Sequence, residues 1–219
     1  MRALRNLLIF VVVLVLLGAA LDVGVRLLLQ SRVESEIEGA DEQIDVGNVE
    51  AEVGSFPFLP GLGLRGEVNH LSLRLEDLVT PGVTFAVFQI TVDGLTFDRS
   101  VLMNAQVQVQ QLDRAVIKAE ITEAAATEAV GVPVTFTPGT ATVQVAGQPR
   151  TATVTLADGD LTLAADGVGE LVIPISESDY FPCVPEAEVK QAKVVLRCTA
   201  DSLPAALRPY LGGAGGGIG

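Results

Sequence analysis

Apolar and polar residues alternate with a period of two along most of the chain after Ile44, which is typical of β-strands with one buried face. Residues 49–53 and 71–76 show this pattern clearly, with acids, serine and arginine at the exposed positions. Residues 82–98 change parity after Val87, which predicts either a bulge or a strand buried on both faces. Further strands are expected at residues 105–112, 132–137, 140–146, 151–156, 171–175 and 193–198.

Helical signals are fewer. Residues 122–130 begin with a threonine in the N-cap position, carry a glutamate in the first turn and stop before Gly131, which predicts a short helix. Residues 203–211 are expected to form a second short helix, and a glycine-rich tail follows. At the other end of the chain, apolar residues recur every four positions from Val25 to Ile37, so a helix is expected there too.

The N-terminal segment has the composition of a membrane anchor. Residues 6–21 carry no charge, and adding residues 23–29, with Arg26 extending toward the interface, gives enough length to span a bilayer. Arg2 and Arg5 place the N-terminus in the cytoplasm and the rest of the chain outside. A cleaved signal peptide ending near residues 18–20 is the alternative. We therefore expect a single-pass plasma-membrane protein whose main domain is extracytoplasmic.

These elements predict an α+β protein in three parts: an anchor at residues 1–30, an exported domain at residues 31–211 and a flexible tail at residues 212–219.

The net charge of the exported part limits the kinds of partner that it can bind. All but three of the 14 basic residues and all but one of the 27 acidic residues follow residue 30, so the exported part has a net charge of −15. Such a surface repels nucleic acid and offers no polybasic patch to anionic headgroups. Binding to lipid would have to depend on apolar burial.

The two cysteines, Cys183 and Cys198, favour one disulfide in an oxidising compartment, worth about 3 kcal/mol in the chain-entropy model. A metal pair is the alternative, but the sequence has one histidine and no CxxC motif.

His70 begins an alternating strand and fits a structural role better than a catalytic one. Asp158 and Asp160 flank the glycine of a predicted hairpin turn, which explains them without a ligand.

The sequence contains no nucleophile elbow, zinc-protease motif, phosphate-binding loop or EF-hand loop. We therefore predict a protein that is not an enzyme and has no cofactor or metal. A hydrolase is the least favoured alternative. Alternating strands with a helix can form an ordinary closed core, or a curved sheet around a helix that leaves an apolar tunnel for acyl chains.

The segment FPFL at residues 56–59 is followed by a glycine-rich stretch and the leucine strand at residues 71–75. Together with VIKAEITEAAATEAVG at 116–131 and FPCVPEAEVKQAKVVLRCTADSLPAAL at 181–207, this order of segments resembles the LmeA-like phospholipid-binding family over residues 20 to 210. The resemblance implies a fold related to the tubular lipid-binding proteins, with a strongly curved antiparallel sheet wrapped around a long amphipathic helix. It also implies a membrane-tethered, periplasmic protein that supports the metabolism of envelope glycolipids.

The expected ligands are the acyl chains of a phospholipid or glycolipid, next to a membrane. The side chains expected to gate or line the apolar site are Phe56, Phe58, Leu59, Leu62, Leu64, Leu71, Leu73, Leu75, Phe85, Phe88 and Ile90. Ordinary core packing is the alternative for each of them. The alternative function is that of a structural partner protein, which stabilises an envelope membrane enzyme through the apolar loop at residues 55–66.

Overall fold

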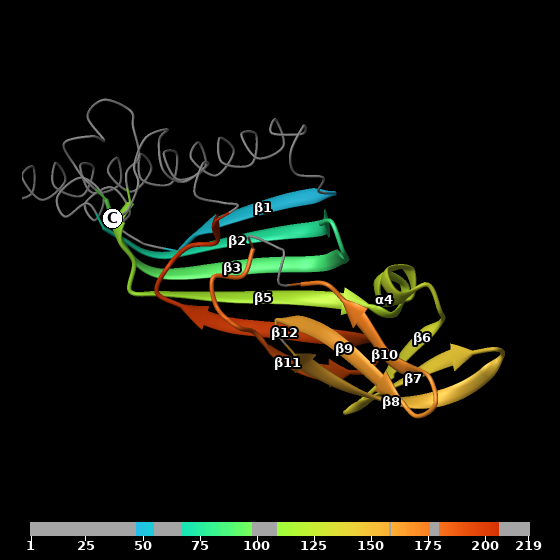
Figure 1. Cartoon of the computed structure of the whole chain (residues 1–219). Helices are drawn as coiled ribbons and strands as arrows, with labels where there is room; N and C mark the ends of the chain where they lie inside the picture. The colour runs from blue at the N-terminus through green and yellow to red at the C-terminus, as the bar shows by residue number, and fades with distance from the viewer. Residues whose placement is uncertain (1–46, 55–66, 98–108, 158, 176–179, 206–219) are drawn as a thin grey trace, which may run out of the picture.

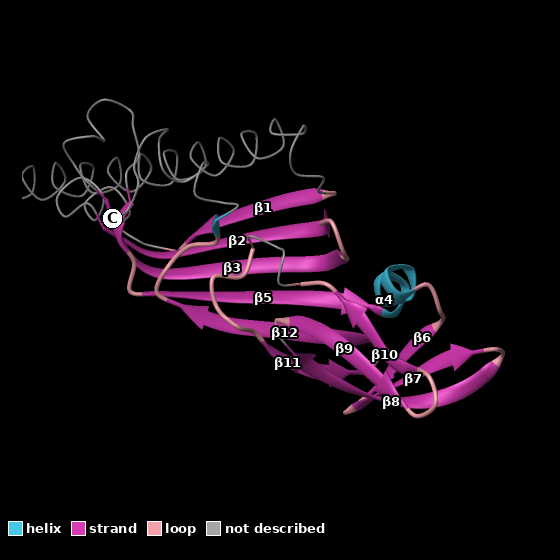
Figure 2. Ribbon diagram, in the orientation of Figure 1, coloured by secondary structure: helices cyan, strands magenta, loops and turns pink. Residues whose placement is uncertain are grey.

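The computed structural model describes residues 47–54, 67–97, 109–157, 159–175 and 180–205 of the chain. These residues form twelve β-strands and one helix, arranged as two antiparallel sheets (Figures 1 and 2). We refer to the larger as sheet A and to the smaller as sheet B. The prediction that β structure dominates the chain is therefore confirmed for the described residues.

Sheet A combines strands from both halves of the chain in the order β1-β2-β3-β5-β12-β11, with β4 paired to β3. Its strands are β1 (Asn48–Val53), β2 (Glu67–Val79), β3 (Thr84–Phe97), β4 (Val109–Gln111), β5 (Arg114–Thr122), β11 (Glu186–Lys190) and β12 (Lys193–Ala200). In β5 every second side chain is buried, as a half-buried strand requires: alanine and isoleucine alternate with Arg114, Val116, Lys118, Glu120 and Thr122. β5 lies in the middle of the sheet and pairs with both β3 and β12.

Sheet B is a meander of five consecutive strands in the order β10-β9-β8-β7-β6. Its strands are β6 (Val134–Thr137), β7 (Thr140–Val145), β8 (Gln148–Ala157), β9 (Asp160–Ala165) and β10 (Gly169–Ile173). Short turns containing Gly139, Gly147, Gly159 and Gly167, all with positive φ, join its neighbouring strands. The largest side chains of its core are fully buried: Phe136, Leu161, Leu163 and Ile173.

The helix α4 (Glu123–Val130) joins the two sheets and confirms the predicted helix. The Thr122 side chain accepts a hydrogen bond from the Ala125 amide, and Gly131 ends the helix with a φ of 72°. Because β6 is an edge strand, its outward backbone groups need other partners. The Thr127 hydroxyl accepts from the Val134 amide at 2.9 Å, and a Glu123 carboxylate oxygen accepts from the Phe136 amide at 2.7 Å.

The hairpin formed by β11 and β12 adds two backbone hydrogen bonds beside that edge. The Ala192 amide donates to the Phe136 carbonyl, and the Gly139 amide donates to the Val189 carbonyl, both at 3.1 Å. These two bonds continue the hydrogen bonding of sheet A into sheet B. In Figure 1 the two sheets follow one another, with α4 beside the ends of β5 and β10.

The parity change predicted in residues 82–98 is a local break in alternation. Phe85 and Phe88 are three positions apart, so regular alternation would place them on opposite faces, yet their ring centroids are 6.0 Å apart. On the neighbouring strand β2, Asp77 has a φ of +53°. It lies opposite this break, because Glu76 pairs with Val87 and Leu78 pairs with Phe85. The pairs Glu76–Val87 and Leu78–Phe85 keep the same register, so the alternation breaks here without the extra residue that defines the predicted bulge.

Two expectations are wrong. The fold class is not α+β with a sheet around a long helix: the described residues contain two antiparallel sheets and one eight-residue helix. The resemblance implied that long helix, and the amphipathic segment that the residue pattern predicted from Val25 to Ile37 lies outside the described residues.

The second wrong expectation concerns the location of the protein. No helix in the described part of the chain is long and apolar enough to cross a membrane, which contradicts the predicted single-pass plasma-membrane location. The predicted anchor at residues 1–30 lies outside that part.

Candidate functional site

One face of sheet A is apolar across four adjacent strands. The register aligns its side chains in rows across β2, β3, β5 and β12. The three central rows are Leu71–Val92–Ala115–Ala200, Leu73–Ile90–Ile117–Cys198 and Leu75–Phe88–Ala119–Leu196. Ten of these twelve residues are buried, and the other two, Leu71 and Ala200, pack against the same core as partly buried side chains.

The opposite face of sheet A is charged. By register, six of the seven lysines and arginines in the described residues lie on this face: Arg74, Arg114, Lys118, Lys190, Lys193 and Arg197. They lie among seven acids: Glu50, Glu52, Glu76, Asp93, Glu120, Glu186 and Glu188. The two faces of the sheet therefore differ sharply in chemistry, and only one of them suits an apolar ligand.

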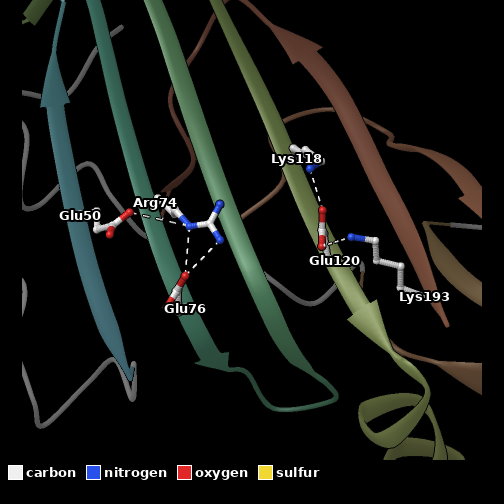
Figure 3. Close-up of polar contacts among 6 residues, drawn as sticks. All are labelled: Glu50, Arg74, Glu76, Lys118, Glu120 and Lys193. Atoms are coloured by element: carbon white, nitrogen blue, oxygen red, sulfur yellow. Dashed lines mark hydrogen bonds and ion pairs between the residues drawn. The ribbon is translucent and has the colours of Figure 1, made fainter. Parts of the chain in front are cut away.

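Glu120 is the most buried acid of the charged face, with 12% of its side chain exposed. Its two carboxylate oxygens accept hydrogen bonds from Lys118 at 2.6 Å and from Lys193 at 2.7 Å (Figure 3). Burial alone would raise the pKa of Glu120, but the hydrogen bonds and charges of the two lysines outweigh burial and lower it. Both lysines are therefore engaged in holding a structural carboxylate.

A second ion-pair group lies on β1 and β2 of the same face. The Arg74 guanidinium donates two hydrogen bonds to Glu76, at 3.0 and 3.1 Å, and lies 3.8 Å from Glu50 (Figure 3). All three side chains are substantially exposed, so this group contributes little net stability.

His70, the only histidine, belongs to a row of polar side chains across three strands. Its Nδ1 lies 2.9 Å from one oxygen of Asp93, and the other oxygen accepts a hydrogen bond from Arg114 at 3.0 Å. The hydrogen bond with His70, followed by that with Arg114, lowers the pKa of Asp93. The row occupies the end of β2, β3 and β5, where it links three strands of sheet A.

An aromatic cluster lies on the apolar face. The rings of Phe85 and Phe88 meet those of Tyr180 and Phe181, with centroid distances of 5.5 to 6.1 Å and mostly edge-on geometry. Two residues further along the chain, Cys183 forms a disulfide with Cys198 of β12, which confirms the predicted pairing.

The structure brings together six of the residues predicted to line the site: Leu71, Leu73, Leu75, Phe85, Phe88 and Ile90. They come from β2 and β3 and share the apolar face. The other five, Phe56, Phe58, Leu59, Leu62 and Leu64, lie outside the described residues. Ordinary core packing accounts for the burial of the first six as well as a ligand site does, so their role in binding is a proposal.

Sequence reasoning missed part of this face. The buried positions of β5, Ala115, Ile117, Ala119 and Ile121, alternate with polar residues except at Val116, so a period-two test of residues 114–122 would have found them. Tyr180 and Phe181 carry no such signal, because they lie in an irregular segment and reach the face only through the fold. No group of three or more histidine, cysteine or acidic side chains in the described ranges is arranged to hold a metal ion.

The fold and the face define an antiparallel β protein with one broad apolar sheet surface and a charged surface behind it. A family model described as LmeA-like phospholipid-binding matches residues 20–208, which is most of the chain. The protein therefore belongs to the LmeA-like phospholipid-binding family, as the order of sequence segments indicated. No curated protein and no solved structure matches the chain.

Proposed function

We propose that this protein binds phospholipids without chemical conversion, by packing their acyl chains against the apolar face of sheet A. The observation that carries the proposal is the three aligned rows of apolar side chains across β2, β3, β5 and β12. Membership of a phospholipid-binding family supports it. The described polar clusters support a non-enzymatic role, since Glu120 and Asp93 are held by ion pairs within the sheet.

The energy of such binding can come from apolar contact alone. Burying one methylene group is worth about 0.8 kcal/mol, so about ten methylenes supply a gross gain of roughly 8 kcal/mol. That value corresponds to a micromolar complex before the costs of ordering the ligand are subtracted. The strongly acidic protein therefore needs no cationic patch to retain a lipid.

The resemblance to the family further implies a role in the metabolism of envelope lipids. The disulfide between Cys183 and Cys198 supports function in an oxidising compartment, where such bonds persist. We propose that the acyl chains of the lipid contact the side chains of Leu71, Leu73 and Ile90.

The test is to purify the full chain, load it from vesicles of phosphatidylglycerol, re-isolate it and quantify bound lipid by extraction and mass spectrometry. Near-stoichiometric lipid is expected for the natural protein, whereas L73Q, which adds an amide to the apolar face, should bind several-fold less. T91Q adds the same amide to the opposite face of the adjacent strand and should bind normally. Equal loss of lipid in both variants, or no lipid on the natural protein, would refute the proposal.

A photo-crosslinker at Leu71 separates the two functions considered from the sequence. Lipid adducts support acyl-chain binding. One dominant protein adduct in cells, without lipid adducts, would instead indicate a structural partner protein.

A further inference from the structure

We propose that residues 180–183, here called the strap, form a fixed wall across the apolar face of sheet A and limit the length of the acyl chain that the face accepts. The inference rests on the proposed function and identifies a residue, Phe181, that determines specificity within the same site.

The position of the strap follows from its contacts at both ends. Tyr180 and Phe181 pack on Phe88 of β3, with ring centroids 5.5 and 5.8 Å away, and Cys183 is bonded to Cys198 of β12. Since β5 lies between β3 and β12 in the sheet, the strap has to pass over β5.

Small side chains on β5 accommodate this crossing. Ala119 stands between Phe88 and Leu196 in the register, and it is fully buried although its side chain is a single methyl group. A large side chain there would compete with the strap for the same volume.

Both ends of the strap are held, since Tyr180 is buried and packs on Phe88 at one end. The disulfide holds Cys183 to the sheet at the other end. Earlier in the chain, the Ile175 amide donates to a carboxylate oxygen of Asp160 at 2.8 Å, and Ile175 itself is 1% exposed. Pro174 packs so closely on Gly82 that a Cβ at position 82 would lie 2.8 Å from the Pro174 carbonyl oxygen. A segment held to the sheet at both of its ends suits a wall better than a gate.

The wall divides the apolar face in two. Toward α4, Leu78, Phe85 and Ile121 are fully buried behind the aromatic cluster. On the other side lie the rows that contain Leu73 and Leu71, with Val92 and Ala115 in the second of them. An acyl chain lying along the strands on that side ends at Phe181. Each further methylene would have to displace an anchored aromatic ring.

The experiment uses the full chain and a mixture of phosphatidylglycerols that differ only in acyl-chain length. After loading and re-isolation, bound lipids are extracted and their chain lengths are compared by mass spectrometry. F181L shortens the wall and should shift the bound population toward longer chains. A115L adds bulk to the side that contains Leu71 and Leu73 and should shift the bound population toward shorter chains.

F136L is the matched control, because it makes the same substitution in the core of sheet B. It should keep the chain-length distribution of the natural protein. If F181L binds lipid with an unchanged distribution, or if A115L does so, the wall is refuted while the proposed function stands. If the natural protein binds no lipid, the proposed function itself fails.

Discussion

Glu123 stabilises the protein chiefly by protecting the edge of a strand, a role that a surface glutamate at a helix start does not usually have. Its carboxylate oxygen accepts a hydrogen bond of 2.7 Å from the amide of Phe136, a residue with no exposed surface. In E123A this buried amide loses its partner, because the neighbouring strand β7 pairs with the other edge of β6.

The cost can be estimated from these contacts. A buried donor left unsatisfied costs about 1–3 kcal/mol, and loss of a negative charge from the first turn of α4 adds about 0.3–1 kcal/mol. We therefore expect E123A to lower the free energy of unfolding by about 2–3 kcal/mol, which lowers Tm by roughly 4–12 °C for a chain of this size. E123Q keeps an acceptor oxygen but no charge, so it should lose about half as much.

The assay is equilibrium unfolding in urea, followed by circular dichroism. E128A is the control, since it removes an exposed glutamate from the same helix and should change stability by at most about 0.5 kcal/mol. This role of Glu123 is refuted if E123A unfolds at the same urea concentration as E128A, or if E123Q is as unstable as E123A.

Three further predictions concern other parts of the described structure. Removing the disulfide in C183A/C198A should cost about 3 kcal/mol, visible as a lower Tm that added reductant no longer changes; a Tm that still falls with reductant would contradict this. Because the pKa of Glu120 is lowered in the folded protein, its contribution to stability is present above the ordinary pKa of 4.5 and is lost as pH falls through the lowered value. K118M should therefore raise the pH of acid unfolding, and K190M, which leaves Glu120 with both its lysines, should leave it unchanged. G94A should be destabilised by more than 1 kcal/mol in urea unfolding, because φ there is +68° and an added Cβ would collide with the Asp113 carboxylate; a neutral G94A would refute this strain.

The strands of this protein were predictable wherever one face meets water, because alternation is then visible in the sequence. Residues 49–53 and 71–76 are such cases, and the predicted helix at residues 122–130 carried its own cap residues. The strand β11 was missed because all five of its residues are at least partly exposed, so its apolar signal is reduced to Ala187 and Val189.

The candidate site was predictable in part for the same reason. Leu71, Leu73 and Leu75 indicated one apolar face, but the partners that complete it come from β5 and β12. Nothing local in the sequence states that residues near 117 and 198 will lie beside residues near 90. The common face of Phe85 and Phe88 was also hidden, since it depends on the positive φ of Asp77 on the neighbouring strand.

The central pairing of β5 with β12 has a consequence for the order in which the chain acquires its structure. Glu120 and Lys193, joined by a salt bridge in this pair, are 73 residues apart in the sequence. During synthesis β5 emerges long before β12, so the whole of sheet B is made while one edge of β5 has no strand beside it. Pairings between such distant segments slow folding and leave strand edges exposed to other chains. Sheet B is a meander of neighbouring strands, so it can form early and hold the two halves of sheet A near each other until β12 closes the gap.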